Sequence, residues 1–131
     1  MAELFSGPWM ERFVEEWNGE PSLYEALEKI GFSSVIGYGF AGEDRPAGVL
    51  KVEKGRAVAG GPHQDEALNW DIRASREQWE KWMQKPPGMS GLGLAVTTGK
   101  MKFKVGDYAA MLKDPRMAGP FIKSFTVMAR V

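Results

Sequence analysis

The sequence predicts an α+β fold in which a mostly antiparallel sheet of about five strands is covered on one face by helices. Three observations support this prediction. Helical periodicity comes first, then short strand-like segments separated by turn residues, then a strand–helix–strand–helix order. This order is typical of helices gathered on one face of an antiparallel sheet. Because no repeat or linker divides the chain, we expect residues 1–131 to form a single domain.

Two helices are expected before the first strand. Pro8 is typical of a helix start, because its missing N–H would be unpaired at that position anyway. Large apolar side chains then recur at helical spacing: Trp9, Met10, Phe13, Val14 and Trp17. Asn18-Gly19 ends this helix, and a second is expected from about Ser22 to Ile30.

The period then changes to that of strands. Three short strands are expected, over Phe32–Phe40, Ala47–Glu53 and Arg56–Ala59. Lys54-Gly55 is typical of a tight hairpin between the second and the third. The segment 60–66 is interpreted as a polar loop that leads to a further strand at Asn69.

The stretch from Asn69 onward carries the most regular patterns. Ser75 and Gln78 have capping-box spacing, and behind them Trp79, Trp82 and Met83 share one helical face. Residues 100–105 alternate strictly between cationic and apolar side chains, as in a strand with one buried face and one solvent-exposed face.

A helix with an apolar stripe is expected after that strand, and a further one in the C-terminal tail. The stripe consists of Tyr108, Met111 and Leu112. Asp114-Pro115 is typical of a helix cap, whereas Gly119-Pro120 predicts a kink or break in the tail.

The ordered pattern resembles the sterol carrier protein type 2 family of lipid-binding domains. The matching stretches are 70–75, 78–83, 99–107 and 109–112, which is less than half of the chain. The resemblance implies a fold with an apolar cavity between sheet and helices. It further implies binding and transfer of a sterol, fatty acid, fatty acyl-CoA or similar lipid, with no turnover. Pro86 to Thr98 departs from the family, which usually has a short polar helix there. Its glycines among apolar residues favour a flexible gate over a rigid helix.

Composition excludes several classes of protein. Lys plus Arg and Asp plus Glu both number 17, so no net charge recruits nucleic acid. The chain has no cysteine, which excludes disulfides and thiolate sites and fits a cytoplasmic protein. No apolar run approaches the ~20 residues of a transmembrane segment, and no signal peptide is apparent.

The sequence offers no catalytic or metal-binding constellation, so we expect neither an enzyme nor a cofactor. Gly37 to Gly42 fits G-x-G-x-x-G literally, but a turn follows it where a nucleotide site needs a helix. The single histidine, His63, is interpreted as an exposed loop residue. Glu66, Asp71 and Asp107 remain possible single acids without a named partner.

Apolar residues of the matching stretches and the tail are the candidate ligand-binding site. They are Trp79, Trp82, Met83, Leu92, Leu94, Met101, Phe103, Val105, Met111, Leu112, Phe121 and Phe125. Their periodicity is the same for a filled core and for a cavity, and the preference for a cavity comes from the resemblance. Lys100 and Lys102 are candidate contacts for a lipid headgroup, with a solvated outer face as the alternative.

We expect ligand to pass between the Met89–Val96 segment and the tail segment that holds Phe121, Ile122 and Phe125. A truncation after Leu112 then keeps its fold, unless those tail residues are fixed core. The alternative function is that of an accessory protein docked on a lipid- or hydrocarbon-metabolising enzyme. Its contact would be the first helix, through Trp9, Phe13 and Trp17.

Overall fold

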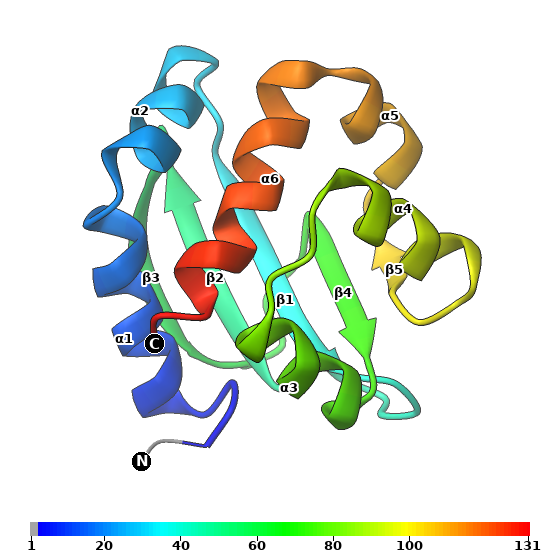
Figure 1. Cartoon of the computed structure of the whole chain (residues 1–131). Helices are drawn as coiled ribbons and strands as arrows, with labels where there is room; N and C mark the ends of the chain where they lie inside the picture. The colour runs from blue at the N-terminus through cyan, green and yellow to red at the C-terminus, as the bar shows by residue number, and fades with distance from the viewer. Residues whose placement is uncertain (1–2) are drawn as a thin grey trace.

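The computed structural model describes residues 3–131 and contains one five-stranded sheet covered by helices on one face (Figure 1). The strands are β1 (Ser34–Phe40), β2 (Gly48–Glu53), β3 (Arg56–Pro62), β4 (Trp70–Ala74) and β5 (Lys102–Val105). The helices are α1 (Gly7–Asn18), α2 (Pro21–Lys29), α3 (Arg76–Gln84), α4 (Met89–Thr97), α5 (Tyr108–Lys113) and α6 (Pro115–Met128). The predicted α+β class is confirmed.

The strand order is β3-β2-β1-β4-β5, and every neighbouring pair is antiparallel except β1 with β4. On the central strand β1, Tyr38 pairs with Gly48 of β2 and with Ile72 of β4. Because side chains alternate along a strand, Ile36 and Tyr38 point to the same face as Ile72. This is the face that the helices cover, and α6 crosses its middle (Figure 1).

Aromatic side chains dominate the core between sheet and helices. Buried members from both ends of the chain meet there: Phe5, Trp9, Phe13, Trp17, Tyr38, Trp79, Trp82 and Phe125. Phe5 lies 5.0 Å from Trp79 between ring centroids, and Trp79 stacks on Phe125 at 6.2 Å. The N-terminal segment, α3 and α6 are therefore held together by direct ring contacts.

The helix caps follow the sequence signals. The side chains of Ser6, Ser75, Asp107 and Asp114 each accept a hydrogen bond from a backbone N–H in the first turn of α1, α3, α5 and α6. At the predicted hairpin, Lys54 and Gly55 both have positive φ (47° and 87°), as a two-residue turn between twisted strands requires.

Strand β3 is longer than predicted. It continues through Gly60 and Gly61 to Pro62, a stretch predicted to be loop, and pairs with β2 along that length. A Cβ on Gly60 would lie 2.7 Å from the carbonyl oxygen of Met10. The absence of a side chain at Gly60 therefore lets α1 pack closely on the sheet. The sequence pattern had indicated a turn at this glycine, but it lies within a strand. The other predicted strands differ by no more than two residues at their starts.

The segment expected to be a flexible gate is helix α4, so that prediction was wrong. Leu92 is fully buried and Ala95 nearly so, which anchors one face of the helix in the core. Thr97 and Thr98 close its last turn by donating side-chain hydrogen bonds to the carbonyls of Gly93 and Leu94. Helical glycines cost roughly 1 kcal/mol each, and burial of Leu92 at about 2 kcal/mol offsets much of that cost.

The C-terminal tail is also more regular than predicted. Helix α6 runs through Gly119-Pro120 without a break, although Pro120 removes one helical hydrogen bond. Phe125, Val127 and Met128 are each at most 1% exposed, so tertiary packing holds the helix. The tail is fixed core, and a truncation after Leu112 would remove side chains worth roughly 3–5 kcal/mol for a single Phe.

The first helix does not present its aromatic face to a partner. Trp9, Phe13 and Trp17 are 6%, 0% and 2% exposed and point into the core. The docking contact expected for an accessory protein is therefore wrong. Within the part of the chain that the structure describes, no helix is long and apolar enough to cross a membrane.

Candidate functional site

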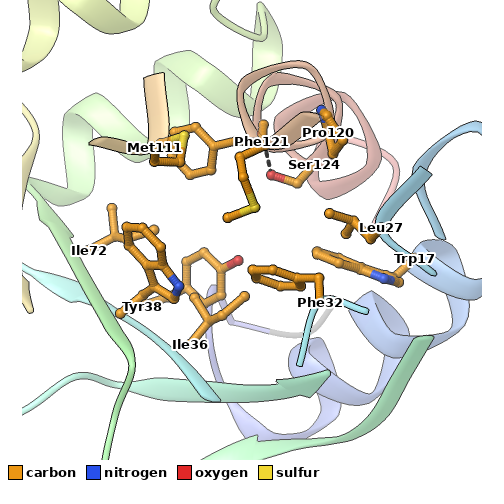
Figure 2. A pocket seen from close by; sticks show the side chains of 12 residues that line it. Trp17, Leu27, Phe32, Ile36, Tyr38, Ile72, Met111, Pro120, Phe121 and Ser124 are labelled. Carbon is orange, nitrogen blue, oxygen red and sulfur yellow. Dashed lines mark hydrogen bonds between the residues drawn. The ribbon is translucent and has the colours of Figure 1, made fainter. Parts of the chain in front are cut away.

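An apolar pocket lies between the helix-covered face of the sheet and helices α2, α5 and α6 (Figure 2). Strands β1 and β4 form its floor, and α6 forms most of its roof. The lining residues are Trp17, Leu27, Phe32, Ile36, Tyr38, Trp70, Ile72, Met111, Met117, Pro120, Phe121 and Ser124. Its volume is about 40 Å³. This is room for roughly two or three water molecules or a few carbon atoms.

The lining contains no charged side chain. Its polar side-chain groups are the hydroxyls of Tyr38 and Ser124 and the indole N–H groups of Trp17 and Trp70. The Trp17 N–H donates to the carbonyl of Gly55 at 2.9 Å, and the Ser124 hydroxyl donates to the carbonyl of Phe121. Burial raises the pKa of Tyr38, so its hydroxyl stays protonated at neutral pH.

Two of the predicted site residues line this pocket, and several others pack beside it. Met111 and Phe121 belong to the lining. Trp79, Trp82 and Phe125 form a buried aromatic cluster next to the pocket. The cluster contacts the pocket lining through Phe125, whose ring lies 5.2 Å from that of Phe121. Leu92 is buried in the same core, and Met83 packs against it half-buried.

A third group of predicted residues lies at the β5 edge. Met101, Phe103 and Lys102 line a wide, solvent-open hollow beside the start of α5. Val105, at the end of β5, is 40% exposed, and Leu94, on α4, is 65% exposed. A β-bulge pairs Val105 with Asp71, where regular alternation from the Ile72–Phe103 pair would place Lys104. The bulge thus breaks the alternation on which a continuous apolar wall was predicted.

The remaining predicted residues do not meet in one place. Lys100 is exposed in the turn before β5, and Leu112 is half-buried on α5. The row Lys100, Lys102 and Lys104 is solvent-exposed, and Lys104 approaches the carbonyl of Glu43 at 3.5 Å.

Sequence reasoning missed most of the pocket lining. The missed residues are Trp17, Leu27, Phe32, Ile36, Tyr38, Trp70, Ile72, Met117, Pro120 and Ser124. Ile36 and Tyr38 alternate with Gly37 and Gly39, which was a usable signal for one apolar face of a central strand. The parallel pairing of β1 with β4, which brings Ile72 beside Tyr38, has no local sequence signature.

The three candidate acids and the histidine all have structural partners. Asp71 accepts two hydrogen bonds from Arg73, at 2.6 and 3.0 Å, and both residues are buried. Asp107 caps α5. Glu66 accepts from the backbone N–H of Gln64 and lies 3.7 Å from the His63 ring. Burial raises the pKa of Glu66, but hydrogen bonds from the backbone N–H groups of Gln64 and Glu66, with the charge of Lys51 nearby, outweigh burial and lower the pKa.

His63 is less exposed than predicted. Its side chain retains 11% of its accessible surface. Its Nδ1 atom accepts a weak hydrogen bond from the guanidinium of Arg45 at 3.4 Å, which helps to cover the ring. Among residues 3–131 no group of three His, Cys, Asp or Glu side chains is placed to hold a metal ion.

Comparisons with known proteins identify the fold. The chain is similar to a sterol carrier protein 2, with 17% identity and a TM-score of 0.77 over 98% of this chain and 99% of that one. It is also similar to a conserved hypothetical protein of Thermus thermophilus that is described as a candidate sterol carrier protein. That match has 17% identity and a TM-score of 0.69 over 96% and 90% of the two chains.

A UbiJ-SCP2 ubiquinone synthesis protein gives a weaker match, with 11% identity and a TM-score of 0.56 over 93% and 88% of the two chains. No protein-family model matches the sequence. No curated protein matches it significantly. The fold is that of sterol carrier protein 2, as the resemblance in the sequence implied.

Proposed function

We propose that this chain is a single-domain, non-enzymatic carrier that binds an apolar ligand in the pocket between its sheet and helices. The ligand class is a fatty acyl chain or a similar lipid, and the compartment is the cytoplasm. The proposal is supported by the sterol carrier protein 2 fold, whose solved examples include proteins described as sterol carriers. The single observation that carries it is the uncharged pocket between the sheet and helices α2, α5 and α6.

The pocket is too small for a long chain without rearrangement. Met111 and Met117 are unbranched and flexible, so they are suited to move aside as a chain enters. Phe32, Met117 and Phe121 are half-buried, which places movable apolar side chains at the outer part of the pocket. We propose that the ligand enters there, between the start of β1 and α6, and not beside α4 as the sequence suggested.

Two exposed lysines, one on β5 and one in the turn before it, complete the proposal. Lys102 borders the open hollow next to Phe103, whose ring lies 6.0 Å from the pocket residue Phe121. We place a charged headgroup, such as the phosphate of an acyl-CoA, on Lys102 and Lys100, with lysine acting as a point charge. The solvated-face alternative predicts that neutralising both lysines leaves ligand affinity unchanged.

The test is saturable binding of dansyl-labelled undecanoic acid, with a variant that fills the pocket. Met117→Trp should weaken binding more than tenfold, because the larger side chain occupies space that the ligand needs. Met89→Trp is the matched control, since Met89 is 47% exposed on α4 and lies outside the pocket. Absence of saturable binding to the wild type would contradict the proposal. Equal binding by folded Met117→Trp and Met89→Trp proteins would place the ligand elsewhere.

A further inference from the structure

The hydroxyl of Tyr38 lies inside the pocket without a partner. The residue is 3% exposed, its oxygen borders the pocket, and none of the hydrogen bonds described for residues 3–131 involves that oxygen. Figure 2 shows the oxygen pointing toward the middle of the ring formed by the lining residues. A hydroxyl that borders a pocket and has no partner on the chain is free to hydrogen-bond a molecule that enters the pocket. The pocket therefore holds an available hydrogen-bonding group at a defined position.

The ring of Tyr38 is fixed by its neighbours. It stacks on Phe5 at 5.6 Å with an interplanar angle of 25°, and it meets the edges of Phe13 and Trp79 at 5.7 and 6.2 Å. These contacts come from the N-terminal segment, α1 and α3, so the ring cannot turn toward another acceptor without disturbing the core. Strand β1 thus aims the hydroxyl into the pocket.

Tyr38 is the more deeply buried of the two donors in the lining that remain available. The donors of Trp17 and Ser124 are already bound to carbonyls of the chain, and the indole N–H of Trp70 belongs to a residue that is only half-buried. No lysine, arginine or histidine lines the pocket to balance a negative charge. An ionised carboxylate or phosphate at this depth would therefore be strongly disfavoured, whereas an uncharged oxygen requires only one donor.

We propose that Tyr38 is the polar anchor of the pocket and that the bound ligand places an uncharged oxygen against its hydroxyl. A ketone, ester, thioester or alcohol oxygen fits, and the apolar part of the ligand then packs on the surrounding side chains. This inference rests on the proposed function and narrows its ligand class. Because burial raises the pKa of Tyr38, the hydroxyl remains a donor throughout the physiological pH range.

The test compares two ligands that differ only in the oxygen. 2-Nonanone and nonane each displace dansyl-labelled undecanoic acid from the wild type, from Tyr38→Phe and from Tyr24→Phe. Tyr38→Phe should raise the Kd of 2-nonanone about tenfold and change that of nonane by less than about twofold, because one hydrogen bond is lost. Tyr24→Phe should change neither, since Tyr24 packs under Arg56 outside the pocket.

A second measurement needs no variant. The carbonyl stretching band of 2-nonanone bound to the wild type should lie at lower frequency than in hexane, because it accepts a hydrogen bond. A band at the hexane position would overturn the anchor, and so would equal effects of Tyr38→Phe on both ligands. If the dansyl probe still binds in those cases, the proposed function stands and only the anchor fails. If neither the probe nor either competitor binds the wild type, both are overturned.

Discussion

The two faces of the sheet are packed differently. On the helix-covered face, aromatic and aliphatic side chains pack to form the core but leave the pocket between β1, β4 and α6. On the opposite face, Gly37 and Gly39 of β1 lie next to Asp71 and Arg73 of β4. A Cβ on Gly39 would lie 2.8 Å from Cα of Pro46 and 3.1 Å from Cδ of Arg73, so no space remains there.

The back face is closed by a charged pair whose hydrogen-bonding groups are satisfied. Arg73 donates to both carboxylate oxygens of Asp71 and, at 2.7 Å, to the carbonyl of Glu43 in the β1–β2 loop. The polar groups of this face are matched to each other, whereas the front pocket keeps an unmatched hydroxyl on Tyr38. The packing around Gly39 and Arg73 is therefore tighter than the packing around Tyr38.

The largest effect should follow from breaking the back-face pair. Arg73→Ala leaves the Asp71 carboxylate buried without its cation, and we expect a loss of about 3–5 kcal/mol in the free energy of unfolding. Urea denaturation measures it. Arg73→Met combined with Asp71→Ala should be less destabilising than Arg73→Ala, because no uncompensated charge remains. A stability of Arg73→Ala close to that of the wild type would show that the pair does not hold this face.

A smaller effect should follow from adding one methyl group to the back face. Gly39→Ala pushes a Cβ into Pro46 and Arg73, and overpacking of this kind costs about 1–3 kcal/mol. Gly61→Ala on β3 is the matched control, because its Cβ would have no neighbour within 4 Å. Thermal unfolding should separate the two variants by several degrees. Equal melting temperatures would mean that the back face has room after all.

The front face should respond to alkaline pH through Tyr38. Because burial raises its pKa, the folded chain keeps a proton that the unfolded chain releases above pH about 10. The free energy of unfolding is therefore unaffected by Tyr38 below pH about 10. Above it, stability should fall by at most about 1.4 kcal/mol per pH unit.

Denaturation between pH 8 and 11.5 measures this dependence. Tyr38→Phe should flatten it and Tyr24→Phe should not. Some slope will remain in Tyr38→Phe, because burial also raises the pKa of Tyr108. An unchanged slope in Tyr38→Phe would contradict the buried, protonated hydroxyl.

The fold was largely predictable because its signals are local. Caps such as Ser75, the hairpin at Lys54-Gly55 and the amphipathic stripe of α1 each act within a few residues. The predictions that failed concern segments where tertiary packing overrides propensity. Buried Leu92 stabilises α4 despite its glycines, and the buried side chains of α6 compensate for Pro120.

The candidate site was less predictable because it depends on pairing across the chain. Tyr38 and Ile72 become neighbours only through the parallel pairing of β1 with β4. The β-bulge that changes the register of Val105 belongs to the pairing of β4 with β5. Met111 and Phe121 were predicted because they lie on recognisable helical stripes. A glycine–aromatic alternation such as that around Tyr38 indicates a strand with one crowded face, and it was the strongest unused signal.

The central claim is that the ligand occupies the pocket between β1, β4 and α6, and methionine methyl groups can test it directly. The eight methionines are spread along the sequence, and Met111 and Met117 line the pocket. In a ¹³C-methyl-methionine NMR titration with 2-nonanone, the resonances of these two should shift most. Met89, exposed on α4, and Met101, at the open hollow beside β5, should remain nearly unchanged. Shifts centred on Met89 and Met101, with Met111 and Met117 unaffected, would contradict the account.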